Sequence, residues 1–367
     1  MPSIRFVNHA SVVISDGKIS LLSDPWYWGS AFHDGWSLIY ENKKEDILNL
    51  LDEISHIWIS HEHPDHFSIP FFKKYVGKLR EKKIKILFQE TKDKRVFSFL
   101  NSQGLSVKEL KNGKMYFLSD KFKIKCIKNN FYDSALLLEV CEKIIFNLND
   151  CPIHKNKQIK KFKGKYGPCD ILLTQFSYAA WKGGRENLIW RKQAAQEKFD
   201  TVLNQARILS AQIVLPFASY IRFSNVLNFY LNDSINTPDL LIEKMKKENF
   251  KLVFFQPMEK QMLESIEQNP QSLEFWKAKY DTISDQALIK YDKVISFKEL
   301  QELYKKYRER VFKNNSYWII WFLSKFKILG SFQKINILIK DINVLFSLDL
   351  LSKNLSITDG EADISMN

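Results

Sequence analysis

One stretch decides the fold: Ile54-Ser55-His56-Ile57-Trp58-Ile59-Ser60-His61-Glu62-His63-Pro64-Asp65-His66. Its first half is a short apolar run, which is typical of a buried strand. The run stops at residues 61–66, where three imidazoles and the Asp65 carboxylate stand close together. Zinc and iron both accept imidazole nitrogen and carboxylate oxygen as ligands. We therefore predict a metal site at the C-terminal end of a buried strand.

The local geometry of an extended chain would bring these donors together. His61 and His63 point to one side of such a segment, and Asp65 and His66 in the following turn can fold back toward them. A surface turn that is rich in His by chance is a weak alternative, because the whole chain contains only 7 His.

The pattern His-x-His-x-Asp-His after a hydrophobic strand resembles the signature of the metallo-β-lactamase superfamily. The resemblance implies an α/β protein built as a four-layer αββα sandwich, with a small C-terminal α/β extension in this chain. It leaves the reaction open, because one fold carries many chemistries.

Other residues match the same superfamily. The resemblance places His9, in Asn8-His9-Ala10-Ser11, and Asp24, in Ser23-Asp24-Pro25-Trp26, beneath the metal. Asp24 would orient a ligand imidazole from outside the ligand set. Asp150, at the end of a later strand, matches the Asp that bridges or completes the metal site. We assign Asp65, His66 and His9 to the catalytic group, and the metal ligands are expected among His61, His63, Asp65, His66 and Asp150.

The chain departs from the superfamily at two ligands. A His is expected shortly before the strand at 135–140, where the sequence reads Asn129-Asn130-Phe131-Tyr132-Asp133. A late His is also missing, since the matching strand end reads Pro216-Phe217-Ala218-Ser219-Tyr220. The sequence therefore favours a single divalent ion, iron or zinc, over a binuclear zinc site.

A narrower resemblance, over most of residues 1–350, is to the catalytic region of the CMP-N-acetylneuraminate hydroxylases. The matching segments are Asp24-Pro25-Trp26, 29–32, Gly35-Trp36, Asp150-Cys151 and 216–220. That family hydroxylates the N-acetyl group of CMP-sialic acid at an iron site fed by a Rieske iron–sulfur centre. The resemblance implies a metal-dependent enzyme that acts on an anionic sugar or sugar nucleotide through a metal-activated oxygen or water.

The electron supply separates two forms of this hypothesis. The family's Rieske domain precedes the catalytic region, whereas this sequence begins with the first predicted strand. The fragment Cys151-Pro152-Ile153-His154 cannot hold a cluster by itself. An oxygenase would take electrons from a separate Rieske or ferredoxin protein, and a hydrolase would need none.

Two further classes stay open. One is a phosphodiesterase or lactonase acting on a phosphorylated small molecule or lipid, which shares the Asn-His-Ala-Ser opening but would want the two missing His. The other is a non-catalytic binding protein built on a degenerate site.

Two segments are predicted to contact the substrate. Residues 25–40 are too aromatic and Gly-punctuated for regular structure and would form a wall or lid over the cleft. The segment after Asp150 is predicted as a lysine-rich loop that borders the cleft and attracts phosphate. A helix predicted at 187–209 is assigned to packing. The residues assigned to substrate binding are Trp26, His33, Trp36, Tyr220, Lys155, Lys157, Lys160 and Lys161.

Composition bounds the rest. The resemblance implies that the metallo-β-lactamase core is complete by about residue 270, which gives a catalytic domain at 1–270 and an extension at 271–355, and the polar end of the chain predicts a disordered tail at 356–367. A net charge of +13 favours an anionic small-molecule partner, with no nucleic acid expected. The four scattered Cys and the lack of a signal peptide predict a cytoplasmic protein. The apolar segment 317–332 is expected to pack within the extension in preference to lying on a membrane surface.

Overall fold

The computed structural model describes residues 1–129, 133–290 and 294–366. The chain divides into two compact units, Met1–Ile289 and Lys290–Asn367. The domain boundary near residue 270, expected from the resemblance, stays a prediction, and helix α7 (Pro270–Asp281) lies within the first unit. Residues 130–132, part of the stretch in which a ligand His is missing, lie outside the described residues.

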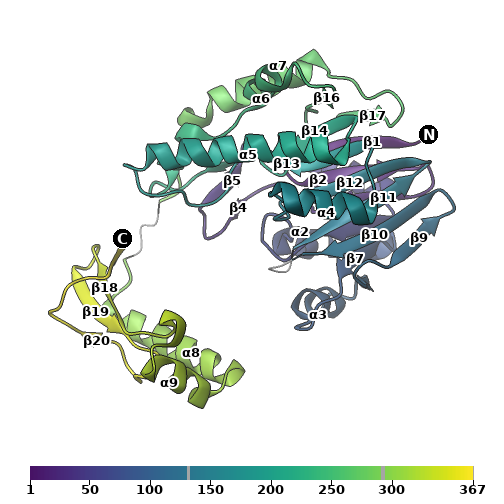
Figure 1. Ribbon diagram of the computed structural model, residues 1–367. Coiled ribbons are helices and arrows are strands. Elements are labelled where there is room, and N and C mark those ends of the chain that lie inside the picture. The colour runs from purple at the N-terminus through teal and green to yellow at the C-terminus, as the bar shows by residue number, and fades with distance from the viewer. Residues whose placement is uncertain (130–132, 291–293, 367) are drawn as a thin grey trace. The chain divides into compact units, whose positions relative to one another are not determined.

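Two seven-stranded sheets face each other in the first unit (Figure 1). The first has the order β17-β1-β2-β3-β6-β7-β8. Its strands are β1 (Ser3–Asn8), β2 (Ser11–Ser15), β3 (Ser20–Ser23), β6 (His56–Ile59), β7 (Lys85–Gln89), β8 (Ser106–Leu110) and β17 (Lys260–Met262). The second has the order β16-β14-β13-β12-β11-β10-β9. Its strands are β9 (Met115–Ser119), β10 (Phe122–Lys128), β11 (Ser134–Val140), β12 (Lys143–Asn149), β13 (Ile171–Gln175), β14 (Ile213–Phe217) and β16 (Lys251–Leu252).

Alternation along β6 shows how the first sheet is covered on both faces. Ile57 and Ile59 pack in one core cluster with the helices α1 (Lys44–Glu53), α2 (Ile69–Glu81) and α3 (Arg95–Ser102). Trp58, which points the other way, packs in the core between the two sheets. The strand is therefore apolar on both sides, and this explains its continuous hydrophobic sequence.

The outer face of the second sheet is covered by four helices. They are α4 (Asn156–Tyr166), α5 (Leu188–Leu209), α6 (Pro238–Met245) and α7. Figure 1 shows α4 and α5 lying across this sheet. Phe162 of α4, Val202 of α5 and Trp276 of α7 join the core cluster that also fills the space between the sheets. The predicted four-layer αββα arrangement is confirmed.

Two local predictions are wrong. Residues 25–40 are not wholly irregular, because β4 (Ser30–Ala31) and β5 (Trp36–Leu38) form a small sheet with the distant strand β15 (Ile221–Phe223). A partner so far along the chain is invisible to a local pattern. The lysine-rich segment predicted as a loop is the helix α4, which buries Ile159 and Phe162 at helical spacing.

The second unit combines the helices α8 (Phe297–Asn314) and α9 (Tyr317–Lys325) with a sheet of order β20-β19-β18-β21. Its strands are β18 (Ile335–Ile339), β19 (Val344–Leu348), β20 (Ser356–Ile357) and β21 (Ile364–Met366). A small core of Tyr304, Ile337, Phe346 and Leu355 holds these elements together. Two of the short strands fall in the tail for which composition predicts disorder. Among the described residues, no helix is long and apolar enough to cross a membrane.

The role of α7 in the first unit can be tested at Trp276, which is 0% exposed. Its ring stacks on Tyr220 with centroids 4.0 Å apart, and its N–H donates to the Phe255 carbonyl at 2.8 Å. We expect Trp276→Ala to destabilise the first unit by about 3–5 kcal/mol in urea unfolding, because the change leaves a large cavity.

The matched control is Trp318→Ala, since Trp318 of α9 is 73% exposed. That substitution should change stability by no more than about 0.5 kcal/mol. Equal effects of the two substitutions would mean that α7 contributes little to the first core.

Candidate metal centre

The His-rich turn begins where β6 ends. The backbone N–H groups of His66 and Phe67 both donate to the His63 carbonyl, at 3.0 and 2.7 Å, and this closes a tight turn. The Ser68 hydroxyl then accepts the Phe71 N–H and caps α2. The strand end, the turn and the helix start therefore hold the donors of residues 61–66 at one edge of the sheet.

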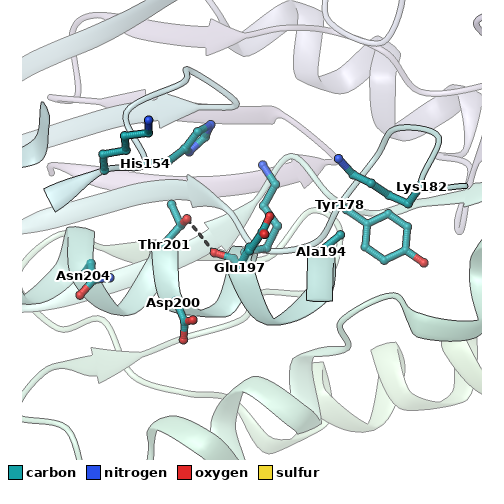
Figure 2. A pocket seen from close by; sticks show the side chains of 10 residues that line it. His154, Tyr178, Lys182, Ala194, Glu197, Asp200, Thr201 and Asn204 are labelled. Atoms are coloured by element: carbon teal, nitrogen blue, oxygen red, sulfur yellow. Dashed lines mark hydrogen bonds between the residues drawn. The ribbon is translucent and has the colours of Figure 1, made fainter. Parts of the chain in front are cut away.

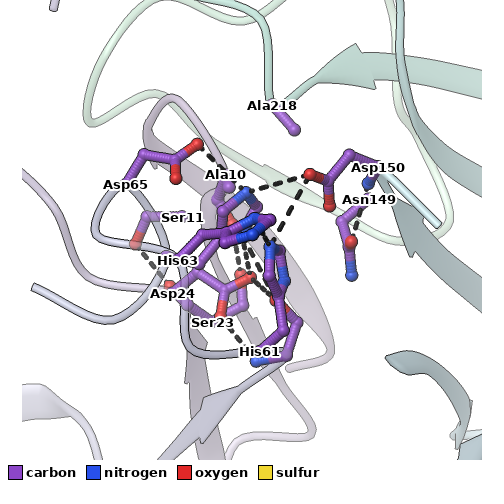
Figure 3. Close-up of polar contacts among 12 residues, drawn as sticks. Ala10, Ser11, Ser23, Asp24, His61, His63, Asp65, Asn149, Asp150 and Ala218 are labelled. Carbon is purple, nitrogen blue, oxygen red and sulfur yellow. Dashed lines mark hydrogen bonds and ion pairs between the residues drawn. The ribbon is translucent and has the colours of Figure 1, made fainter. Parts of the chain in front are cut away.

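The ligand atoms of this turn converge with Asp150, which directly follows β12 (Figure 3). His61 Nε2 lies 2.9 Å from His63 Nδ1, and His66 Nε2 lies 3.4 Å from Asp65 Oδ2. Asp150 Oδ2 is 3.7 Å from both His61 Nε2 and His66 Nε2. The structure thus brings together all five residues that the sequence proposed as metal ligands, with Asp150 between two imidazoles.

Asp133 is a sixth member that sequence reasoning missed. It directly precedes β11, at the place where the resemblance predicts a His, and its Oδ1 lies 3.8 Å from His61 Nε2. The signal was present in the sequence as an Asp just before a strand. The superfamily pattern has an imidazole at this place, so the pattern does not single out a carboxylate there.

His9 reaches the cluster from the end of β1. Its Nε2 lies 3.3 Å from Asp65 Oδ2, and its ring packs edge-on against Trp26 and His66. Ala218, which stands where the late His is expected, donates its backbone N–H to the His9 carbonyl at 2.7 Å. The strand end where the late His is missing is therefore joined through its backbone to His9, which supplies an imidazole to the cluster.

These side chains fit a divalent cation. Among the described residues, three overlapping groups have ligand atoms within 4.8 Å of one another: His61, His63 and Asp133; His61, His66 and Asp150; and His9, Asp65 and His66. Asp65 Oδ1 and Asp150 Oδ1 are buried without a hydrogen-bond partner among the described residues. A buried carboxylate oxygen without a partner is costly, and a bound cation would supply one.

Asp24 orients the cluster from behind. Its Oδ1 accepts the Ser60 N–H and its Oδ2 accepts the Ser60 hydroxyl, each at 2.7 Å. The same Oδ2 lies 2.9 Å from His66 Nδ1. A proton on Nδ1 would leave the unprotonated Nε2 of His66 facing Asp65 and Asp150.

Burial and mutual charge set the pKa values. Burial lowers the pKa of His61 to about 4, and the neighbouring His66 adds to this. Burial raises the pKa of Asp133 to about 7, with a further contribution from Asp150. Burial would lower the pKa of His66, but Asp65, Asp150 and Asp24 outweigh it and hold that pKa well above its usual value. The acidic side chains therefore retain a positive charge at the centre of the cluster.

A cavity of about 490 Å³ opens over His63, Asp65 and Asp150. Phe32 and Trp36 line it, so the aromatic segment 25–40 does reach the cleft. Trp26 and Tyr220 do not line it, because they are 2% and 1% exposed and packed in the core. His33 is exposed on the same segment and is not among the lining residues.

The basic residues at the cavity differ from those predicted. Lys182 and Lys198 line it, whereas Lys157, Lys160 and Lys161 are exposed on α4 and are not among its lining residues. Lys155 lines a neighbouring cavity. Lys198 lies on the helix that was assigned only to packing. The aromatic and Gly-rich sequence 178–184 between a strand and a helix was the available signal for this loop.

The chain is similar in sequence to curated cytidine monophosphate-N-acetylneuraminic acid hydroxylases. It is 24% identical to the Danio rerio protein over 274 residues, which covers 70% of this chain and 45% of that protein. It is 26% identical to the Gorilla gorilla gorilla protein over 266 residues, covering 67% and 42%. The chain thus spans about half the length of the curated relatives it matches. No family model matches the chain.

This chain also resembles solved structures in its fold. The diiron β-hydroxylase CmlA from Streptomyces venezuelae aligns with a TM-score of 0.50 and 13% identity over 71% of this chain and 54% of that one. The chain has the metallo-β-lactamase fold, as predicted, and its sequence resemblance to the hydroxylases is confirmed. The sequence predicts a metal-dependent enzyme, the relatives are named as hydroxylases, and His and Asp groups that could hold a metal are present among the described residues.

Asp150 offers the most direct test of the ligand set. We expect Asp150→Ala to weaken Fe²⁺ and Zn²⁺ binding roughly 10-fold or more, because a carboxylate between two imidazoles is lost. Asp239→Ala is the control, since Asp239 is exposed in the first turn of α6. Wild-type affinity in the Asp150 variant, measured by titration of metal-free protein, would remove this residue from the site.

The pKa shifts predict how metal binding depends on pH. Protons on Asp133 and His66 must leave before these atoms accept a cation, so metal affinity should rise as pH increases through about 7. Titration calorimetry in buffers of different ionisation enthalpy should show net proton release. Asp133→Asn should bind metal more weakly and with a shallower pH dependence. A pH-independent wild-type affinity between about 6 and 8 would contradict the assignment.

Proposed function

We propose that this chain is a non-haem iron oxygenase domain that hydroxylates an anionic sugar nucleotide. The observation that carries the proposal is the composition of the ligand groups: each of the three contains two His and one Asp. Two imidazoles and one carboxylate with open positions are typical of iron sites that use dioxygen. The curated relatives, named as hydroxylases of cytidine monophosphate-N-acetylneuraminic acid, support the substrate class.

We further propose two neighbouring ion positions. One would be held by His61, His63 and Asp133, the other by Asp65, His66 and His9, with Asp150 between them. Charge supports this number. Asp24, Asp65, Asp133 and Asp150 lie around the cluster, and four ionised carboxylates are balanced by two divalent cations.

The balance of the proposed hydroxylation shows which electrons and protons a partner must supply. One atom of dioxygen enters the substrate carbon–hydrogen bond as a hydroxyl group, and the other leaves as water. This consumes two electrons and two protons, which an iron–sulfur donor of the Rieske or ferredoxin type would deliver. When bound, iron would supply the one-electron chemistry with dioxygen that amino-acid side chains lack.

The protein's own part is to bind, orient and keep water out. Phe32 packs on Trp36 with centroids 4.3 Å apart and on the His63 ring at 5.6 Å. These rings line the cavity beside the cluster, where they would exclude water from the reacting group. Lys182 and Lys198, which also line the cavity, would hold the anionic part of the substrate.

The alternative is a hydrolase, in which the metal lowers the pKa of a bound water to create a nucleophile. It would have a mainly imidazole ligand set and zinc. The carboxylate at 133, in place of an imidazole, and the absence of an imidazole in the strand end 216–220 speak against it.

The test uses protein loaded anaerobically with Fe²⁺ and supplied with a ferredoxin reductant and CMP-N-acetylneuraminate. We expect a product that gains one oxygen atom, and heavy-isotope-labelled dioxygen should deliver that atom. A product whose new oxygen atom comes from water, or full activity with zinc in place of iron, would contradict the oxygenase proposal.

The matched variant is His61→Ala with His63→Ala, which removes two donors of the first position. It should lose iron and the hydroxylated product together. Product formation by this variant at the wild-type rate would place the chemistry elsewhere.

A further inference from the structure

A second cavity, of about 410 Å³, lies next to the metal cavity. Three residues line both: Tyr178, Lys182 and Lys198. The two spaces therefore meet at a wall that carries two ammonium groups. Figure 2 shows Lys182 and His154 reaching over the helix that forms the floor of the second cavity.

The positive charge of the second cavity comes from separate parts of the chain. Lys155 precedes α4, Lys182 lies in the 178–184 loop, and Lys198 lies in the middle of α5. Lys182 and Lys198 are half-buried. A cation that is partly shielded from water attracts an anion more strongly than a fully solvated one. Three segments have thus been folded together to place lysines around one space.

Lys198 is the central group. Its ammonium donates to Gln175 Oε1, a single neutral partner at the end of β13. Burial lowers the pKa of Lys198 to about 8; Asp150 opposes this shift and the Lys182 ammonium adds to it. Two nearby ammonium groups repel each other, and an anion between them would relieve the repulsion.

Carboxylates also line this cavity, at Glu197 and Asp200. Both are exposed, and Asp200 accepts a hydrogen bond from Gln196 on the same helix at 2.8 Å. In Figure 2 the Asp200 side chain points away from the side where His154 and Lys182 lie. Asp200 therefore lies at the outer edge, whereas the Glu197 carboxylate is close enough to Lys198 to act on its pKa. The lysines at 182 and 198 line the wall shared with the metal cavity.

We propose that the second cavity is a phosphate subsite, in which Lys182 and Lys198, aided by Lys155, bind a phosphate group of the substrate. The proposal rests on the proposed function, because it divides one substrate between the two cavities. The group to be hydroxylated would lie over the metal centre. The phosphate would lie beyond Lys198, away from the carboxylates of the cluster.

This arrangement explains why the phosphate would not simply ligate the metal. Lys198 lines both cavities and interacts electrostatically with Asp150, so a phosphate in the second cavity would meet this ammonium group at the wall that the cavity shares with the metal cavity. Hydrogen bonds to charged groups are stronger than neutral ones, and two of them would fix the orientation of the substrate. The reacting group would then be the uncharged end.

The experiment measures binding of cytidine 5′-monophosphate and of uncharged cytidine to the full chain, loaded with Fe²⁺ without oxygen. We expect Lys182→Gln and Lys198→Gln each to weaken binding of the monophosphate roughly 10-fold, the loss of one charged hydrogen bond. Cytidine binding should not change. The control is Lys192→Gln, an exposed lysine on the same helix, which should bind both ligands like wild type.

Three results would overturn the proposal. One is monophosphate binding no tighter than cytidine binding in the wild type. The second is Lys182→Gln binding the monophosphate like wild type; this variant lies in a surface loop, so it guards against a folding defect at Lys198. The third is monophosphate affinity that vanishes in metal-free protein while both lysine variants retain it, because the phosphate would then bind the metal.

The outcome is separable from that of the proposed function. If the chain retains no iron but still binds phosphate through the lysines, the phosphate subsite is supported and the oxygenase function is excluded. If the chain transfers oxygen from dioxygen but the lysine variants bind the monophosphate normally, the oxygenase function is supported and the phosphate subsite is excluded.

Discussion

The rest of the site depends on the concentration of carboxylates around His66. Asp24, Asp65 and Asp150 each approach this imidazole within 3.7 Å, and Asp133 faces the adjacent His61. So many carboxylates out of water are unfavourable without positive charge. In the protein alone His66 supplies part of it, which explains why its pKa is held high. The unpartnered oxygens of Asp65 and Asp150 mark where the remaining positive charge belongs.

The backbone conformation shows how the fold brings the side chains of the cluster together. His9, Asp24, Asn149 and Ala218 all have positive φ, between 36° and 53°, and each stands at or just past the end of a strand. Such a conformation costs a non-glycine residue about 1–3 kcal/mol and persists only where the surroundings enforce it. Here it turns the chain sharply out of β1, β3, β12 and β14, so that four strand ends present side chains to one point. The stability of the two-sheet core makes that strain tolerable.

Sequence predicted the parts of this arrangement that are local. The apolar run into residues 61–66, the turn and the capped helix after it are encoded within fifteen or so residues, and the family pattern added Asp24 and Asp150. What it missed depends on distant pairing. Strand β5 is a strand because β15 pairs with it, and Lys198 is a cavity residue because α5 crosses the end of β13. Asp133 was missed for a chemical reason: a carboxylate can take the place of an imidazole as a metal ligand.

Charge also explains the division of the cleft. The chain carries a net charge of +13, so the anionic substrate proposed above would be attracted to the molecule, whereas the carboxylates of the metal centre already supply the negative ligands of the ions. Lys182 and Lys198 line both cavities. They would hold a negative group beside the cluster without allowing it to displace the carboxylates from the metal. An uncharged group on the same molecule would then be the only part free to approach the ion, and this polarity selects which end of the substrate reacts.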